Sequence, residues 1–425
     1  MSVSRNVLAF VCALGLLAAA CSSDDSAKDS RSTSGAAPSY TSEDPAKADA
    51  IMKIVDDYMA QAHLKSVIVR VTVDGKEIVT AARGESMTGV PATTDMHFRN
   101  GAVALSYIST LLLILADEGK LSLDDKLSKY LPDIPNADRV NLRQLAQMTS
   151  GYHDFVLGNE KFAEIAYADP YKAWTTEDQL SLAINDPLWF EPGTNWAYAH
   201  TNYVLLGLVL AKATGTTLAE ALQTKVLDPL GLKNTVPNLT PYIPEPVLHS
   251  FTSERREYFQ LPPDVPFYEE STYWNPSWTL SHGAIQTSDI RDLERSAVAI
   301  GSGELLSDES YRAMTTTDLR GKTTAVPGCV NCRPLDDFQT YGLGLWLTGD
   351  WSYQNPLFYG AAAVNAYLPS KKIAIAVAVT YLPEAFSSSG GYSNGGDALF
   401  RKIGAYLAPE DAPPVKQDTP PQGGS

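Results

Sequence analysis

The sequence predicts an α+β fold in which an antiparallel sheet is built from both ends of the chain. Near the N-terminus, strand-like runs at 67–73 and 77–82 flank Asp74-Gly75, a dipeptide typical of a two-residue hairpin turn. Near the C-terminus, apolar runs at 361–368 and 373–380 are separated by a short polar turn. Strands at both ends of a long chain indicate one sheet closed by the two ends, with a helical insertion between them.

Further elements extend this pattern at each end. Asp44-Pro45 predicts a helix start, because Asp is a favoured N-cap and Pro is favoured in the first turn, and apolar residues then recur at helical spacing. Residues 342–347 predict another strand of the sheet. Residues 396–407 predict a closing helix.

The middle of the chain contains a helix with no polar face. Residues Val103–Ala116 are apolar on every side, and they lie between Gly101 and Gly119, where a left-handed backbone costs little. A helix of this kind belongs in the core of a large fold. Its hydroxyl residues and short apolar run make it a poor membrane span.

The first residues have the layout of an export signal. Residues 1–20 carry Arg5 and then an uncharged apolar run, which predicts a secretory signal peptide. The run ends in Leu17-Ala18-Ala19-Ala20-Cys21, which resembles a bacterial lipoprotein box. We therefore expect Cys21 to be lipidated and to anchor the protein in the cell envelope, on the extracytoplasmic face of the membrane. A plainly secreted protein is the alternative. The polar residues 21–43 predict a disordered tether.

The remaining chain divides into a folded domain and a tail. We place the domain at 44–407, with a sheet subdomain at about 44–95 and 338–407 and a helical subdomain at about 96–337. Residues 408–425 are rich in Pro and predict a disordered tail.

Composition and charge restrict the possible functions. The chain has 425 residues, of which 44% are hydrophobic and 19% charged, which is typical of a globular protein. Its formal net charge of -16 argues against nucleic acid as a partner, because binding phosphates requires a surplus of Lys and Arg. The six histidines are scattered without metal-ligand spacing, so we expect neither a metal nor another cofactor.

Several segments resemble those of one enzyme family. They are Phe98-Arg99 with the helix that follows, Asp117–Asp125 at the end of that helix, Leu142–Tyr152, Glu191–Tyr203 and Leu227–Thr235. They are similar to motifs of the serine beta-lactamase, D-alanyl-D-alanine carboxypeptidase and esterase family of penicillin-binding-protein-like serine hydrolases. This resemblance implies a three-layer α/β/α fold of the beta-lactamase/transpeptidase type.

The same resemblance marks the positions of the catalytic serine and lysine. In the family, Phe-Arg is followed by Gly-Ser-x-x-Lys, but here Ala102 stands at the serine position and Leu105 at the lysine position. Neither side chain can attack a carbonyl or move a proton. No other Ser-x-x-Lys occurs in the chain. Ser106, one helical turn beyond Ala102, is the displaced-nucleophile candidate, but we favour a core serine bonded to a backbone carbonyl.

Two further motif positions also differ. The family's Tyr-x-Asn becomes Tyr198-Ala199-His200, which retains the phenol and replaces an amide by an imidazole. The family's Lys-Thr-Gly or His-x-Gly falls on Tyr359, Gly360 and Ala361, so the cation that would hold a substrate carboxylate is absent. We expect the former catalytic cleft to be lined by the residues at all these motif positions: Ala102, Leu105, Tyr198, His200, Tyr359, Gly360 and Ala361.

These differences favour a pseudoenzyme, that is, an envelope lipoprotein with the family fold and a catalytically inactive cleft. Such a protein would act by binding a cell-wall peptide, a small ligand or another envelope protein. The alternative is a serine hydrolase of beta-lactamase, carboxypeptidase or esterase type with a relocated nucleophile such as Ser106, assisted by Tyr198 and His200.

Two other features have open interpretations. For Cys329 and Cys332 we favour a disulfide that clips a loop, because the predicted export places them in an oxidising compartment; a redox site is less favoured and zinc least. Residues 237–278 are rich in Pro and aromatic side chains, and they predict either a wall of the cleft or a docking surface.

Overall fold

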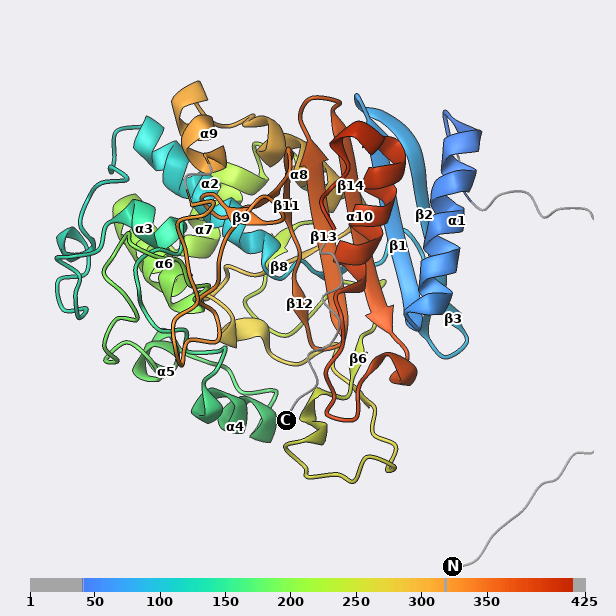
Figure 1. Ribbon diagram of the computed structural model, residues 1–425, viewed down its shortest axis with the longest axis horizontal. Coiled ribbons are helices and arrows are strands. Elements are labelled where there is room, and N and C mark those ends of the chain that lie inside the picture. The colour runs from blue at the N-terminus through green and yellow to red at the C-terminus, as the bar shows by residue number, and fades with distance from the viewer. Residues whose placement is uncertain (1–39, 41, 317–318, 416–425) are drawn as a thin grey trace, which may run out of the picture. The chain divides into compact units, whose positions relative to one another are not determined.

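The computed structural model describes residues 40, 42–316 and 319–415. Their main element is a nine-stranded antiparallel sheet with the order β3-β2-β1-β14-β13-β11-β10-β9, and β12 pairs with β13 (Figure 1). Its strands are β1 (Leu64–Val73), β2 (Lys76–Met87), β3 (Val90–Pro91), β9 (Thr340–Tyr341), β10 (Trp346–Thr348), β11 (Trp351–Gln354), β12 (Leu357–Phe358), β13 (Ala361–Leu368) and β14 (Ile373–Tyr381). β1 pairs with β14, so that Val73 lies opposite Ile373. The predicted sheet from both chain ends is confirmed.

Helices cover both faces of this sheet and give three layers, as the resemblance implied. α1 (Pro45–Gln61) and α10 (Gly395–Leu407) pack on each other and on one face, whereas α8 (Ile290–Ser302) packs on the other (Figure 1). The side chain of Asp44 accepts a hydrogen bond from the Lys47 N–H and caps α1. The polar side of α8 is tied to the sheet by Glu294, which accepts hydrogen bonds from Arg70 and Thr72.

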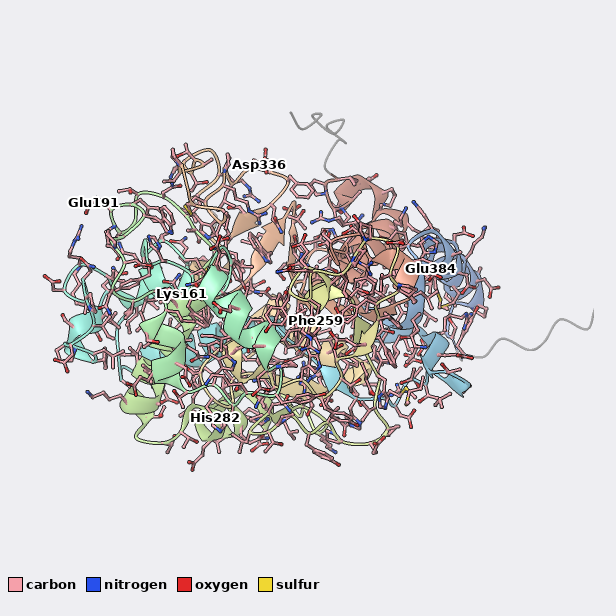
Figure 2. All side chains as sticks on the ribbon, turned by 90° about the horizontal axis from the view of Figure 1, so that it is seen from below. Lys161, Glu191, Phe259, His282, Asp336 and Glu384 are labelled. Atoms are coloured by element: carbon pink, nitrogen blue, oxygen red, sulfur yellow. A yellow bond between two sulfur atoms is a disulfide. The ribbon has the colours of Figure 1, made fainter. Side chains whose placement is uncertain are left out.

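The insertion supplies most of the remaining helices and the small sheets. The helices are α2 (Val103–Asp117), α3 (Leu142–Ala146), α4 (Glu160–Ala168), α5 (Thr176–Ser181), α6 (His200–Thr214), α7 (Leu218–Leu222) and α9 (Asp308–Thr315). β4 (Phe98–Arg99), β8 (Gln286–Ser288) and β5 (Val236–Pro237) form one small sheet, and β6 (Phe251–Thr252) pairs with β7 (Glu269–Glu270). Seen from below, Lys161 of α4 lies on the helical side of the molecule and Glu384 on the side of the large sheet (Figure 2).

α2 is the predicted core helix. Every residue from Val103 to Leu113 is buried, and the helix packs against α6, α7 and α9. It lies between Gly101 and Gly119, whose φ angles of 52° and 68° are left-handed as expected. Burying a helix on all sides requires many short-range contacts, so the position of its first turn is fixed by the rest of the fold.

The predicted strand at 342–347 is wrong. The chain instead forms two short strands, β9 and β10, joined by a tight turn at 342–345. A Cβ on Gly344 would lie 2.5 Å from the Leu105 carbonyl oxygen, and one on Gly342 would lie 2.1 Å from the Met314 carbonyl oxygen. Both glycines therefore allow the turn to approach α2 and α9 closely, which an apolar strand pattern does not reveal.

The chain ends also differ from expectation where the structure describes them. Part of the segment 408–415 packs on the domain, although we expected 408–425 to be disordered: Ala408 is buried, and the Trp351 indole N–H donates to the Asp411 carbonyl (2.7 Å). The Arg401 guanidinium also donates to the Pro414 carbonyl (2.5 Å). The predicted signal peptide, Cys21 and most of the tether lie outside the described residues. The described residues form one compact unit, in which α8 from the expected helical subdomain covers the sheet.

No single helix in the described part of the chain is long and apolar enough to span a membrane. α6 and the segment Leu218–Leu227 reach the required length and composition only as a pair, and they are bent by 76° with respect to each other.

Cys329 and Cys332 are joined by a disulfide. It closes a four-residue turn whose inner residues are Val330 and Asn331. A Cβ on Gly158 would lie 2.8 Å from Val330 Cγ2, so the turn contacts the loop that precedes α4.

We expect Leu111→Ala to lower the free energy of unfolding by about 2–5 kcal/mol, because it removes a fully buried side chain from α2. Leu239→Ala is the matched control, since Leu239 is 56% exposed, and it should change the free energy by less than about 0.5 kcal/mol. Urea denaturation measures both. Equal effects would contradict the central position of α2.

We expect the double variant Cys329→Ser/Cys332→Ser to lose about 2 kcal/mol of stability, the loop-closure value for so short a loop. In a Cys12→Ala/Cys21→Ala chain, a maleimide should label no cysteine without reductant, and two after reduction and unfolding. Full labelling of the native chain without reductant would rule out the disulfide.

Candidate functional site

A cavity of about 550 Å³ lies at the N-terminal end of α2. Several parts of the chain form its wall, including the start of α2, the loop before α4, the segment that leads into α6, residues 278–285, the disulfide-closed turn and residues 354–358. Most of the lining side chains are apolar or aromatic, including Leu105, Trp196, Trp278, Trp346 and Phe358. A concave, mostly apolar space with a few polar groups is the usual form of a small-molecule site.

The start of α2 is held against the opposite wall. A Cβ on Gly101 would lie 2.5 Å from Pro356 Cβ and 2.6 Å from Phe358 Cε1, so only glycine permits this contact. The next residue, Ala102, is the N-cap of α2 and makes no side-chain capping bond. Both Ala102 and Leu105 line the cavity. The expected serine and lysine positions therefore face the cavity with a methyl and an isobutyl group.

Ser106 does not line the cavity. Its side chain is buried, and its hydroxyl donates to the Val103 carbonyl within α2 (2.7 Å). These are the contacts of a core serine. Among the described lining residues the only hydroxyls belong to Tyr198 and Thr279, and Thr279 donates to the Pro276 carbonyl (2.6 Å).

His200 lines the cavity and is held by a carboxylate that the sequence interpretation missed. The carboxylate of Asp154 is fully buried, lies 3.0 Å from His200 Nδ1, and accepts a hydrogen bond from the His200 backbone N–H (3.1 Å). Asp154 thus fixes the imidazole and caps the start of α6. The two residues are 46 positions apart, and no local pattern links them.

Tyr198 stands between the histidine and the aromatic wall. Its ring is 5.3 Å from that of His200 and is stacked on Trp346 at 6.4 Å. Burial, together with the negative charge of Asp154, raises the pKa of the Tyr198 phenol well above its usual value. A phenol in this environment keeps its proton and can donate a hydrogen bond, but it cannot serve as a base at neutral pH.

The predicted cleft positions Tyr359, Gly360 and Ala361 do not line this cavity. Tyr359 and Gly360 form the turn of the β12–β13 hairpin with φ angles of 54° and 72°, and a Cβ on Gly360 would lie 1.8 Å from the Phe251 carbonyl oxygen. The Tyr359 ring packs behind the wall, 5.5 Å from that of Trp278. The close backbone contact at this turn is therefore made by Gly360, and its partner is the protein itself.

The aromatic segment 237–278 contributes one wall. Trp278 lines the cavity, which agrees with the cleft-wall interpretation for this end of the segment. Other aromatic residues of the segment, such as Tyr242 and Phe259, are exposed at 63% and 44%.

One cationic side chain, that of Arg333, also lines the cavity. Arg333 follows the disulfide directly in sequence, and its guanidinium lies 4.8 Å from the centre of the Trp346 ring. The sequence interpretation missed Arg333; the nearby cysteine pair was the one signal that this loop is fixed in place. Within the described ranges, no group of three His, Cys, Asp or Glu side chains could hold a metal ion.

Comparison with known proteins identifies the family. A family model described as Beta-lactamase matches residues 51–399. Penicillin-binding protein 4* of Bacillus subtilis (strain 168) is 29% identical over 147 residues, which are 34% of this chain and 31% of the relative. Penicillin-binding protein 4 of Amycolatopsis lactamdurans is 30% identical over 189 residues, which are 43% and 47% of the two chains. The chain thus spans less than half the length of these two relatives.

Solved structures share the fold. The D-amino acid amidase from Ochrobactrum anthropi SV3 complexed with L-phenylalanine has a TM-score of 0.70 at 22% identity, covering 85% of this chain and 99% of that one. The penicillin binding protein from Bacillus halodurans has a TM-score of 0.66 at 18% identity, covering 84% and 99%. At these identities the likeness concerns the fold alone. Because the family model spans most of the sequence, the chain belongs to the beta-lactamase family of penicillin-binding-protein-like serine hydrolases.

Proposed function

We propose that this member of the beta-lactamase family binds a small ligand non-covalently in the cavity and does not form an acyl-enzyme. The observation that carries this proposal is Ala102, which stands in the cavity wall at the serine position of the family motif. Acyl transfer requires a nucleophile with a base beside it. In the described lining, Ala102 and Leu105 supply neither.

The remaining polar groups do not replace them. The Tyr198 phenol retains its proton, and the Thr279 hydroxyl is engaged with the Pro276 carbonyl. His200 is held by Asp154 and has no serine in the cavity to activate. Loss of one member of such a catalytic set costs several orders of magnitude in rate, because the members act as a unit.

The cavity itself supports binding. It is open to a ligand and lined by aromatic side chains, and its apolar surface would favour a ligand with an apolar group. The relatives named above include penicillin-binding proteins and an amidase complexed with L-phenylalanine. We therefore propose an amino-acid-like or peptide-like ligand, such as a fragment of a cell-wall peptide.

Acylation tests the absence of covalent chemistry. We expect that incubation with a fluorescent penicillin or with p-nitrophenyl acetate adds no mass to the intact protein, and that hydrolysis is no faster than in buffer. Intact-protein mass spectrometry measures the adduct. A stoichiometric adduct in the wild type would contradict the proposal and support the serine-hydrolase alternative.

If an adduct forms, three variants identify the side chain that carries it. Loss of the adduct in Ser106→Ala, Thr279→Val or Tyr198→Phe would locate the relocated nucleophile. The double variant Ala102→Ser/Leu105→Lys is the positive control for the site, since it restores the two motif residues without altering the rest of the lining.

We also propose that the protein is a lipoprotein of the bacterial cell envelope. This rests on the apolar run that follows Arg5 within residues 1–20 and on the box that ends at Cys21. Cys21→Ala should move the protein from the membrane pellet to the soluble fraction of fractionated cells. Unchanged membrane association of this variant would contradict lipid anchoring at Cys21.

A further inference from the structure

The described lining of the cavity contains one permanent charge and no carboxylate. Arg333 is the only Lys, Arg, Asp or Glu among the described residues that line it. No described carboxylate lies within 4.0 Å of its guanidinium, whereas Arg70, Arg255 and Arg401 each pair with at least one. A cation facing an apolar cavity without a partner is unfavourable unless an anion or water meets it.

The guanidinium is held in place by neutral groups. It lies over the rings of Trp346 and Trp196, at 4.8 Å and 5.5 Å from their centres, in cation–π contacts. Its single hydrogen bond to a described residue runs from Nη2 to Gln339 Oε1 (2.8 Å). The remaining N–H donors of the fork are available for a ligand, and a planar fork suits a carboxylate in particular. Burial lowers the pKa of Arg333, but an arginine remains charged at neutral pH.

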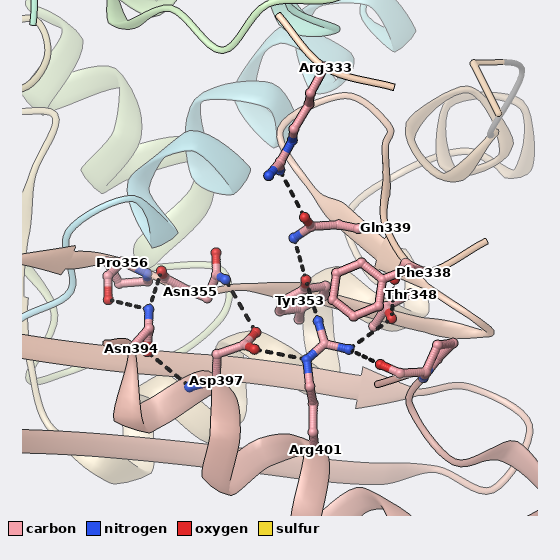
Figure 3. Close-up of polar contacts among 11 residues, drawn as sticks. Arg333, Phe338, Gln339, Thr348, Tyr353, Asn355, Pro356, Asn394, Asp397 and Arg401 are labelled. Atoms are coloured by element: carbon pink, nitrogen blue, oxygen red, sulfur yellow. Dashed lines mark hydrogen bonds and ion pairs between the residues drawn. The ribbon is translucent and has the colours of Figure 1, made fainter. Parts of the chain in front are cut away.

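A hydrogen-bond network fixes the orientation of Gln339 (Figure 3). Gln339 Nε2 donates to the Tyr353 hydroxyl (2.5 Å), which also accepts a hydrogen bond from Arg401 (3.0 Å). Arg401 in turn pairs with Asp397 (2.8 Å). The acid of the network is thus paired with Arg401, and Arg333 is left without a described carboxylate at ion-pair distance, although Asp336 stabilises its charge from farther away.

The loop that carries Arg333 is also fixed at the backbone. The disulfide ends at the preceding residue, Cys332, and the Thr323 hydroxyl donates to the Arg333 carbonyl (3.0 Å). A guanidinium on an anchored loop loses little conformational freedom when a ligand binds.

We propose that Arg333 is the anion-binding residue of the cavity and that the ligand is a small carboxylate with an aromatic or apolar body. The carboxylate meets the Arg333 fork, and the body lies among Trp278, Leu105 and Phe358 on the lining. This inference rests on the proposed non-covalent binding function and specifies its ligand class.

The test compares hippurate, an achiral aromatic N-acyl amino acid, with its neutral amide, hippuramide, by isothermal titration calorimetry. The two probes differ only in the charged carboxylate. The wild type should bind hippurate about tenfold to a hundredfold more tightly, the effect of hydrogen bonds to a charged group. In Arg333→Gln this preference should vanish while hippuramide affinity stays the same, which also shows that the variant folds.

Arg312→Gln is the matched control, because Arg312 is exposed on α9 and makes no ion pair with a described residue; it should retain the preference. Equal binding of the two probes to the wild type, or an undiminished preference in Arg333→Gln, would overturn the role of Arg333 and leave non-covalent binding standing. No binding of either probe at millimolar concentration would overturn the ligand class. A covalent adduct in the acylation experiment would instead overturn the proposed function.

Discussion

The burial of α2 on every side is the constraint on which the cavity depends. Because the helix has no solvent-facing stripe, helices must surround it and the β9–β10 turn must press against it through Gly344. Its first turn then has one possible position, against Pro356 and Phe358 at Gly101. The core of the protein thus places Ala102 in the cavity wall, whatever chemistry that position carries.

There is a physical reason why the family fold is retained although the residues that line its cavity differ from the family motifs. The fold is held by buried apolar area and backbone pairing, to which the residues at 102 and 105 contribute little beyond their volume. Replacing them leaves the cavity open and removes the groups that would react. The polar groups of the site are then Arg333 and the Asp154–His200 pair, and of these Arg333 and Asp154 lie outside the resembling motifs.

The sequence predicted the sheet, the hairpin and the core helix, because each has its own local pattern of apolar residues or turn residues, and the family resemblance implied the three layers. It mispredicted the strand at 342–347 and the cleft position of Tyr359, because close glycine contacts and a left-handed turn depend on partners far along the chain. Asp154 and Arg333 were missed for the same reason. Their roles come from tertiary contacts with His200 and Trp346, and neither lies in a motif.

A crystal structure of the protein soaked with benzylpenicillin tests non-covalent binding in the cavity most directly. We expect benzylpenicillin in the cavity with an intact four-membered lactam ring, with the carboxylate of the ligand beside Arg333 and with no density that joins the ligand to the protein. An opened ring with continuous density to a side-chain oxygen would contradict the account.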